Sequence, residues 1–218
     1  MVDQPVNRIT AIEQQQKDPR RVSIHVDGEF RLGCSVRRVE EFGLQVGGTL
    51  DEQTIAGIQV AEELHEAKAT ALRLLGHRAR TVRDLQTRLQ KKQYAKHTIA
   101  RVTEWLTDLG YLDDHKYAAE RLEALLRTKK MGRHGLMARL IADGCDPGLA
   151  RQAVDDALGP ADEARLAIEL ARERAARMRG KDHRAIKRSV AGLLQRRGFD
   201  AEQIYAALEA VDPADDAW

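Results

Sequence analysis

The chain has 218 residues, of which 43% are hydrophobic, 32% charged and only 4% aromatic. The apolar fraction is high enough for a folded core, and the abundance of Ala, Leu and Arg favours helices over sheets. No run of about 18 apolar residues occurs and no apolar segment follows Met1, so we expect neither a membrane span nor a secretory signal. Two cysteines are too few for a disulfide framework or a four-ligand zinc site, and they indicate a reduced, cytoplasmic protein.

The first 60 residues hold the only strand-like pattern of the sequence. Residues 1–19 are rich in Gln, Asp and Pro and are predicted to form a flexible tail. Residues 20–60 are predicted to form a small N-terminal region with a β-hairpin and short helices. Apolar and polar residues alternate on both sides of Asp27-Gly28, a pair that suits a hairpin turn because both turn positions need positive φ. This alternation places Cys34 on the apolar face, where packing is favoured over a role as a reactive thiol.

Helical periodicity dominates the rest of the chain. A helix that begins after Asp51 is predicted to run to about Leu75, and Thr81 is predicted to cap the next helix. Four apolar residues at spacings of three and four predict one buried face of a following helix: Ile99, Val102, Leu106 and Leu109. Further helices are predicted at about 114–129, 133–143, 147–158, 161–179, 183–196 and 201–210.

An internal repeat orders these helices. Tyr94, Cys145 and Phe199 align at spacings of 51 and 54 residues, and apolar residues recur five and nine positions before each of them. Each follows a Gln or Gly at a helix end, where a left-handed cap is expected. Modules of about 50 residues bury little surface alone, so we expect a mainly α-helical protein of stacked repeats that form an elongated, curved array. The predicted three-helix repeats are 61–110, 112–159 and 161–212, with an acidic tail at 213–218.

The net charge of +2 conceals strongly basic segments. Residues 68–101 carry ten Lys or Arg against one acid, and residues 165–197 carry eleven against three. The basic residues recur around the second helix of each module, which favours a binding stripe for phosphates or an acidic protein over the solvated faces of an Arg-rich protein. The candidate binding residues are Arg78, Arg80, Arg83, Arg88, Lys91 and Lys92 in the first module, Arg127, Lys129, Lys130 and Arg133 in the second, and Arg184, Lys187, Arg188, Arg196 and Arg197 in the third.

No residue pattern indicates catalysis. The sequence lacks a phosphate-binding glycine motif and the His-Glu-x-x-His spacing of a zinc site. The acidic cluster at Asp113-Asp114-His115 precedes a helix, so N-capping is favoured over a metal or nuclease site. Trp105 is interpreted as a core residue in preference to a platform for stacked bases. We therefore expect no enzyme activity, no cofactor and no metal.

Several motifs in chain order resemble one protein family. They include Val-Asp-Gly-Glu-Phe at 26–30, Gly-Tyr-Leu-Asp-Asp at 110–114, Lys-Met-Gly at 130–132 and Arg-Arg-Gly-Phe at 196–199. This ordered set resembles the bacterial regulatory protein family RecX over roughly residues 20–210. Two positions depart from the family pattern, since Gln93 replaces the usual Gly and Cys145 replaces an aromatic or aliphatic residue. Both departures concern helix capping and packing.

The resemblance implies a fold of tandem three-helix repeats and a role in regulating recombination. Proteins of this family bind the RecA recombinase and its filament on single-stranded DNA, limit filament growth and inhibit the ATPase, strand-exchange and coprotease activities of RecA. The implied partners are RecA and the RecA–DNA filament, with single- or double-stranded DNA as a further candidate, no membrane, and a monomeric protein. Two alternatives stay open: a direct DNA-binding regulator with helix-turn-helix-like units, and a nucleic-acid enzyme with an acidic site near Asp113.

Overall fold

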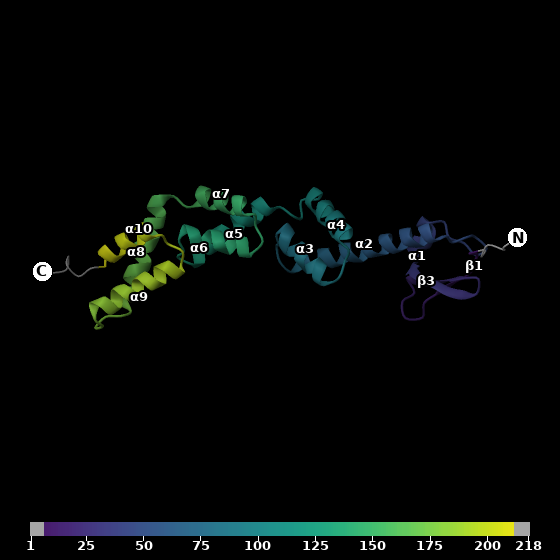
Figure 1. The fold of residues 1–218 in the computed structure, drawn as a ribbon, viewed down its shortest axis with the longest axis horizontal. Helices are drawn as coiled ribbons and strands as arrows, with labels where there is room; N and C mark the ends of the chain where they lie inside the picture. The colour runs from purple at the N-terminus through teal and green to yellow at the C-terminus, as the bar shows by residue number, and fades with distance from the viewer. Residues whose placement is uncertain (1–6, 212–218) are drawn as a thin grey trace. The chain divides into compact units, whose positions relative to one another are not determined.

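The computed structural model describes residues 7–211, and it divides into two units. The first unit comprises Met1–Arg78 and Gln86–Asp108, and the second comprises Ala79–Leu85 and Leu109–Trp218. Within the described residues the chain is mainly helical, with ten helices and three strands (Figure 1). The expectations for residues 1–6 and for the acidic tail at 213–218 lie outside the described residues.

Apart from β1, the elements follow one another in the order that the sequence predicts. The first unit contains β1 (Ile9–Gln14), β2 (Arg21–Val26), β3 (Glu29–Ser35), α1 (Val36–Glu41), α2 (Glu52–His77) and α4 (Lys96–Asp108). The second contains α5 (Asp114–Thr128), α6 (Arg133–Ala142), α7 (Pro147–Ala157), α8 (Pro160–Ala176), α9 (His183–Arg196) and α10 (Ala201–Glu209). The helix α3 (Val82–Lys91) begins in the second unit and ends in the first.

The three strands form one antiparallel sheet in the order β1-β2-β3. The predicted hairpin between β2 and β3 is confirmed, because Asp27 and Gly28 form its turn with φ values of 51° and 88°. Cys34 on β3 is fully buried, and burial raises the pKa of its thiol to about 11, with the nearby Glu62 carboxylate acting in the same direction. The thiol therefore stays protonated and packs as a small apolar group.

The prediction of a flexible tail over residues 1–19 was wrong for the segment that forms β1. Ile9 is 1% exposed and belongs to the same apolar cluster as Ile24 of β2. The Ile9 N–H also donates to the Gly48 carbonyl at 2.8 Å, which ties β1 to the loop before α2. The polar residues of this segment lie mostly on the solvent side, so its composition resembles that of a tail although its backbone is paired.

One long helix, α2, belongs both to the N-terminal region and to the first three-helix module. It begins after Asp51, whose side chain accepts a hydrogen bond from the Thr54 N–H at 2.7 Å, as predicted. Ile55 and Ile58 near its start are buried in the apolar cluster of the sheet, and α2 also packs against α4. Leu109, predicted on the buried face of α4, is instead 54% exposed because α4 ends one residue before it.

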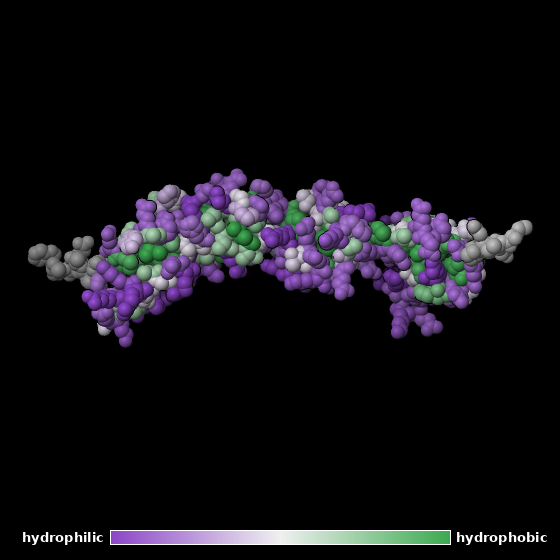
Figure 2. Space-filling model, in the orientation of Figure 1, coloured by the Kyte–Doolittle hydropathy of each residue, from purple (hydrophilic) through white to green (hydrophobic). Residues whose placement is uncertain are grey.

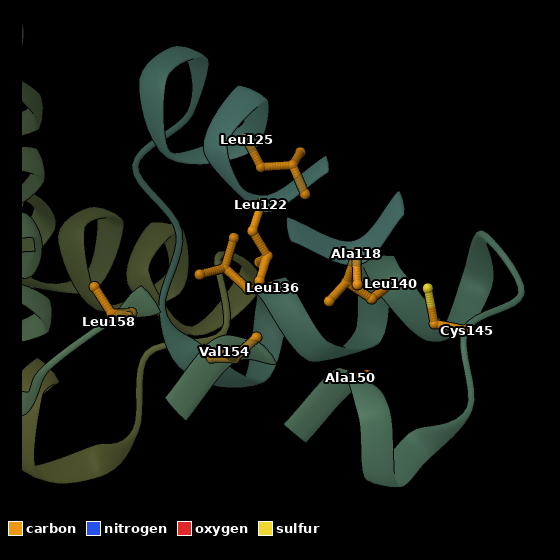
Figure 3. Close-up of a cluster of buried hydrophobic side chains, with 9 residues drawn as sticks. All are labelled: Ala118, Leu122, Leu125, Leu136, Leu140, Cys145, Ala150, Val154 and Leu158. Atoms are coloured by element: carbon orange, nitrogen blue, oxygen red, sulfur yellow. The ribbon is translucent and has the colours of Figure 1, made fainter. Parts of the chain in front are cut away.

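The second unit contains two complete three-helix modules. In α5–α7, side chains from all three helices meet in one apolar cluster that includes Cys145 (Figure 3). In α8–α10, an equivalent cluster surrounds Leu194 and Phe199. Burial in the first of these clusters raises the pKa of the Cys145 thiol to about 11, with smaller contributions from Asp114 and Asp143.

The repeat found in the sequence corresponds to a repeated helix end. The Tyr94, Cys145 and Phe199 N–H groups donate to the carbonyls five residues earlier, at 3.4, 3.0 and 3.2 Å. The residue before each has positive φ, which is 67° at Gln93, 103° at Gly144 and 79° at Gly198. This is the Schellman type of helix end, in which an apolar residue folds back onto the helix. Gln93 takes the conformation that Gly supplies in the other two modules, so the departure noted in the sequence leaves the geometry unchanged.

Candidate interaction surface

The candidate basic residues divide into those that hold the fold together and those that lie exposed. On the face shown in Figure 2, hydrophilic residues cover most of the surface of both units. Arg80 is not part of that surface, because it is only 8% exposed and its guanidinium lies 2.7 Å from Asp84, four residues later. Its position at the start of α3 gives it a structural role.

Lys130 and Arg133 are also engaged within the protein. Lys130 Nζ lies 2.7 Å from Glu173 and 2.9 Å from Glu169, both on α8, and these hydrogen bonds raise the pKa of the lysine. Arg133 forms ion pairs with Asp155 and with Glu163, and donates a hydrogen bond to the Leu158 carbonyl at 3.1 Å. Both side chains therefore bridge the second and third modules.

The other candidates lie at or near the surface. Nine are exposed: Arg78, Arg83, Lys91, Lys92, Arg127, Lys129, Arg184, Arg188 and Arg196. Three are half-buried: Arg88, Lys187 and Arg197. Each module thus keeps exposed cations on or beside its second helix. A stripe that continues over all three modules stays a prediction.

The N-terminus of α3 is covered by the module that follows it, an arrangement that we call the first joint. The Thr81 hydroxyl donates to the Asp143 carbonyl at 2.9 Å and accepts from the Asp84 N–H at 3.1 Å. The Val82 N–H donates to the Asp114 carboxylate at 2.9 Å. The Asp114 carboxylate of the second module therefore satisfies one N–H at the start of α3, and the Asp143 carbonyl holds the Thr81 hydroxyl that satisfies another.

The N-terminus of α6 is covered in the same way by the third module, and we call this the second joint. The Gly132 N–H donates to the Arg197 carbonyl at 3.0 Å, and the His134 N–H donates to the Gly198 carbonyl at 3.2 Å. The Arg133 N–H donates to the Glu163 carboxylate at 2.6 Å. The carboxylate of Glu163 is buried, since this residue is only 2% exposed.

The two joints repeat one arrangement. Shifting the first joint by 51 residues aligns Thr81 with Gly132 and Val82 with Arg133. In both joints the leading helix of one module supplies a carboxylate, and its later turn supplies a carbonyl, to the second helix of the preceding module. Sequence reasoning missed these contacts, although the glycines at 132 and 135 were a usable signal of close backbone approach.

The third module has a different start to its second helix. α9 has 14 residues, whereas α3 and α6 have ten each. Its N-terminus is capped from within by Asp182, which accepts a hydrogen bond from the Ala185 N–H at 3.0 Å. Aligned by the repeated helix end, α9 begins about one turn earlier than α3 and α6, and its first turn is capped within the third module itself.

Within the acidic cluster at the start of α5, Asp113 is the predicted N-cap. Asp113 accepts a hydrogen bond from the Lys116 N–H at 2.9 Å, and Asp114 accepts from Val82 across the first joint. Burial raises the pKa of Asp114 above its usual value of 3.8. Residues 7–211 contain no group of three His, Cys, Asp or Glu side chains arranged to hold a metal ion.

The chain is similar to proteins of one known family. Three sequence models of one family match the chain in order: the regulatory protein RecX N-terminal domain over residues 7–51, the first three-helix domain of RecX over 67–106, and the third three-helix domain of RecX over 161–208. The chain belongs to the RecX family. The RecX N-terminal match begins at residue 7 and so includes β1. RecX proteins are regulatory proteins and not enzymes.

Curated RecX proteins align along most of the chain. The regulatory protein RecX of Bacillus subtilis is 27% identical over 208 residues, which cover 95% of this chain and 78% of the relative. That of Lacticaseibacillus paracasei is 29% identical over 214 residues, covering 97% and 86%. That of Clostridium perfringens strain 13 is 30% identical over 139 residues, covering 64% and 65%.

Solved RecX structures share the fold. A crystal structure of regulatory protein RecX matches with a TM-score of 0.69 and 25% identity, and the match covers 93% of this chain and 98% of that chain. The RecX of Lactobacillus salivarius matches with a TM-score of 0.63 and 20% identity, covering 70% and 98%. Within the described part of the chain, no helix has the length and apolar character needed to cross a membrane.

Proposed function

We propose that this protein binds the RecA recombinase and its filament on DNA, limits filament growth, and inhibits the ATPase, strand-exchange and coprotease activities of RecA. It would act as a monomer in the cytoplasm and modulate DNA repair, homologous recombination and the SOS response. The observation that carries the proposal is the match to RecX domains, in order, between residues 7 and 208. Relatives named regulatory protein RecX support it, since they align along nearly the whole chain.

The exposed cations of the modules are the proposed contact residues. Arg127 and Lys129 at the end of α5, and Arg184 and Arg188 on α9, are exposed and enter no ion pair within residues 7–211. Such residues can neutralise phosphates or meet an acidic protein surface. Lys130, although next to Lys129 in the sequence, already contacts two glutamates of α8. The proposed contact set therefore excludes Lys130, Arg133 and Arg80.

The proposal is tested by adding the protein to RecA that hydrolyses ATP on single-stranded DNA. We expect the rate of hydrolysis to fall at less than one molecule of this protein per RecA. The double variant Arg127→Ala with Lys129→Ala should need a higher concentration for the same inhibition. Lys130→Ala is the matched control, because it removes one positive charge from the same loop but from a side chain that is engaged by α8.

Two outcomes would contradict the proposal. If RecA hydrolyses ATP at an unchanged rate with equimolar protein, and the protein binds naked duplex DNA, the chain is a direct DNA-binding regulator instead. If Lys130→Ala and the double variant weaken inhibition equally, the exposed cations of the second module are not the contact residues.

A further inference from the structure

A recess of about 360 Å³ lies in the first unit among α1, α2 and α4. Arg37 lines it from α1, His65 and Lys68 line it from α2, and Arg101 lines it from α4. These residues are scattered in the sequence, and none of them belongs to the candidate binding residues predicted from the repeat. Only the fold brings them to one concave site.

Three cations of this recess have no acidic partner among the described residues. Within residues 7–211, Arg37, Lys68 and Arg101 enter no ion pair. Glu41, the acidic residue of the lining, is engaged by Arg38 in an ion pair. Three uncompensated positive charges around a concave surface concentrate anions there.

The wall of the recess is held in place by buried polar contacts. Arg38 is only 7% exposed, donates a hydrogen bond to the Ala61 carbonyl at 2.9 Å, and lies 3.3 Å from Glu62. Glu62 also accepts a hydrogen bond from the Ser35 hydroxyl at 2.6 Å. Although burial acts in the opposite direction, these hydrogen bonds and the nearby arginines lower the pKa of Glu62, so it stays ionised beside Arg38. The recess is therefore formed before any ligand arrives.

The ammonium group of Lys68 contacts an aromatic ring. Its Nζ lies 4.2 Å from the centre of the Trp105 ring, a cation–π contact that orients the side chain at the recess. This contact also places an indole next to the charge that a ligand would meet.

We propose that this recess binds a phosphodiester group of a single-stranded nucleic acid. The guanidinium groups of Arg37 and Arg101 can each donate two hydrogen bonds to phosphate oxygens, and Lys68 supplies a point charge. A concave site admits the phosphates of a flexible strand one at a time, whereas the phosphates of a duplex are fixed on a stiff, convex surface. The proposal does not depend on RecA, because it concerns naked nucleic acid and residues outside the basic set of the modules.

Binding of a fluorescent oligothymidine to the full-length protein, measured by anisotropy over a salt series, tests the proposal. The double variant Arg37→Gln with Arg101→Gln should lose about tenfold or more in affinity at low salt. The slope of log affinity against log salt concentration should become shallower by up to about 1.4, because each lost phosphate contact removes about 0.7. The control is Arg20→Gln with Arg31→Gln, which removes the same charge from the first unit at exposed arginines paired with Asp18 and Glu52. This control should bind within about twofold of the wild type.

The fluorescence of Trp105 gives a second readout. In a Trp218→Phe background Trp105 is the only tryptophan, so the oligothymidine should change its emission, and the recess variant should abolish that change. Equal losses of affinity in the recess and control variants would overturn the proposal. So would tighter binding of duplex than of single-stranded DNA. Displacement of the oligothymidine by an acidic peptide, or by inorganic phosphate at matched phosphate concentration, would also overturn it. RecA is absent from the assay, so such a failure would leave the proposed regulation of RecA unaffected.

Discussion

The two joints of the protein have the same topology but different chemistry. At the first joint, the Thr81 side chain spans the gap to the Asp143 carbonyl. At the second joint, two backbone N–H groups reach the backbone of the opposing turn directly, because Gly132 and Gly135 leave no side chain in between. A repeat can therefore keep one docking arrangement while the distance between the two backbones changes, provided that a side chain replaces the missing backbone contact.

The largest effect is expected when a side chain is added to the second joint. A Cβ on Gly135 would overlap the Arg197 carbonyl oxygen, a backbone atom. We expect Gly135→Ala to lower the free energy of unfolding by roughly 2–4 kcal/mol, through overpacking and loss of the adjacent hydrogen bonds. Urea unfolding followed by circular dichroism measures this change.

Gly192→Ala is the matched control for that substitution. Gly192 also lies inside a helix, α9, but a Cβ there would meet only the end of the flexible Arg196 side chain, at 3.3 Å. We expect a gain of up to about 1 kcal/mol, because Ala is the better helix former. If both substitutions stabilise the protein, the two backbones of the second joint are not in close contact.

The next largest loss of stability is expected at the two carboxylates that accept hydrogen bonds across the joints. Glu163 is 2% exposed, whereas Asp114 is only partly buried. Glu163→Ala leaves the Arg133 N–H and guanidinium without this partner, and we expect a loss of about 1–3 kcal/mol. Asp114→Ala should cost less, about 0.5–2 kcal/mol, as is typical of a helix cap. Thermal and urea unfolding of both variants gives the ranking, and a larger loss at Asp114 would contradict it.

A smaller effect is expected at the Thr81 hydroxyl. Thr81→Ala removes the bond to the Asp143 carbonyl and the cap on Asp84, at a cost of about 0.5–2 kcal/mol. Thr81→Ser keeps the hydroxyl and should restore most of that stability in the same unfolding assay. Equal losses in the two variants would show that the methyl group, and not the hydroxyl, matters at the first joint.

The smallest effect is a dependence on pH at the first joint. Burial raises the pKa of Asp114 in the folded protein. The stabilisation linked to its protonated form is therefore present in full below pH 3.8, the usual pKa, and is lost as the pH rises through the raised pKa. Asp114→Asn keeps an acceptor for the Val82 N–H and cannot ionise. Its free energy of unfolding should therefore rise relative to the wild type between about pH 3 and pH 7, and a constant difference would contradict the assignment.

The fold was predictable wherever a local signal was sufficient. Three kinds of feature depend only on residues within a few positions of one another: the turn at Asp27-Gly28, the caps at Asp51 and Asp113, and the repeated helix end. These features could therefore be predicted from the sequence. The strand β1 was missed because its composition is polar. What makes it a strand is its hydrogen bonding to β2 and to the loop that contains Gly48.

The candidate site was predictable only in part, because charge counts do not reveal partners. Arg80, Lys130 and Arg133 were among the candidate binding residues, yet each is paired within the protein. Conversely, Arg37 and Arg101 were not among those candidates, yet they line one recess without an acidic partner among the described residues.

The sequence by itself determined the helices, their ends and the threefold repeat, since helix periodicity, capping residues and left-handed turns depend on short-range contacts along the chain. The tertiary structure alone decided which residues are available to a partner. A charged side chain becomes structural or free according to the groups that long-range folding places within a few ångströms of it, as Glu163 and Glu173 are placed beside Arg133 and Lys130. The same long-range packing made Gly135 a contact point, because only there does a second backbone approach the helix.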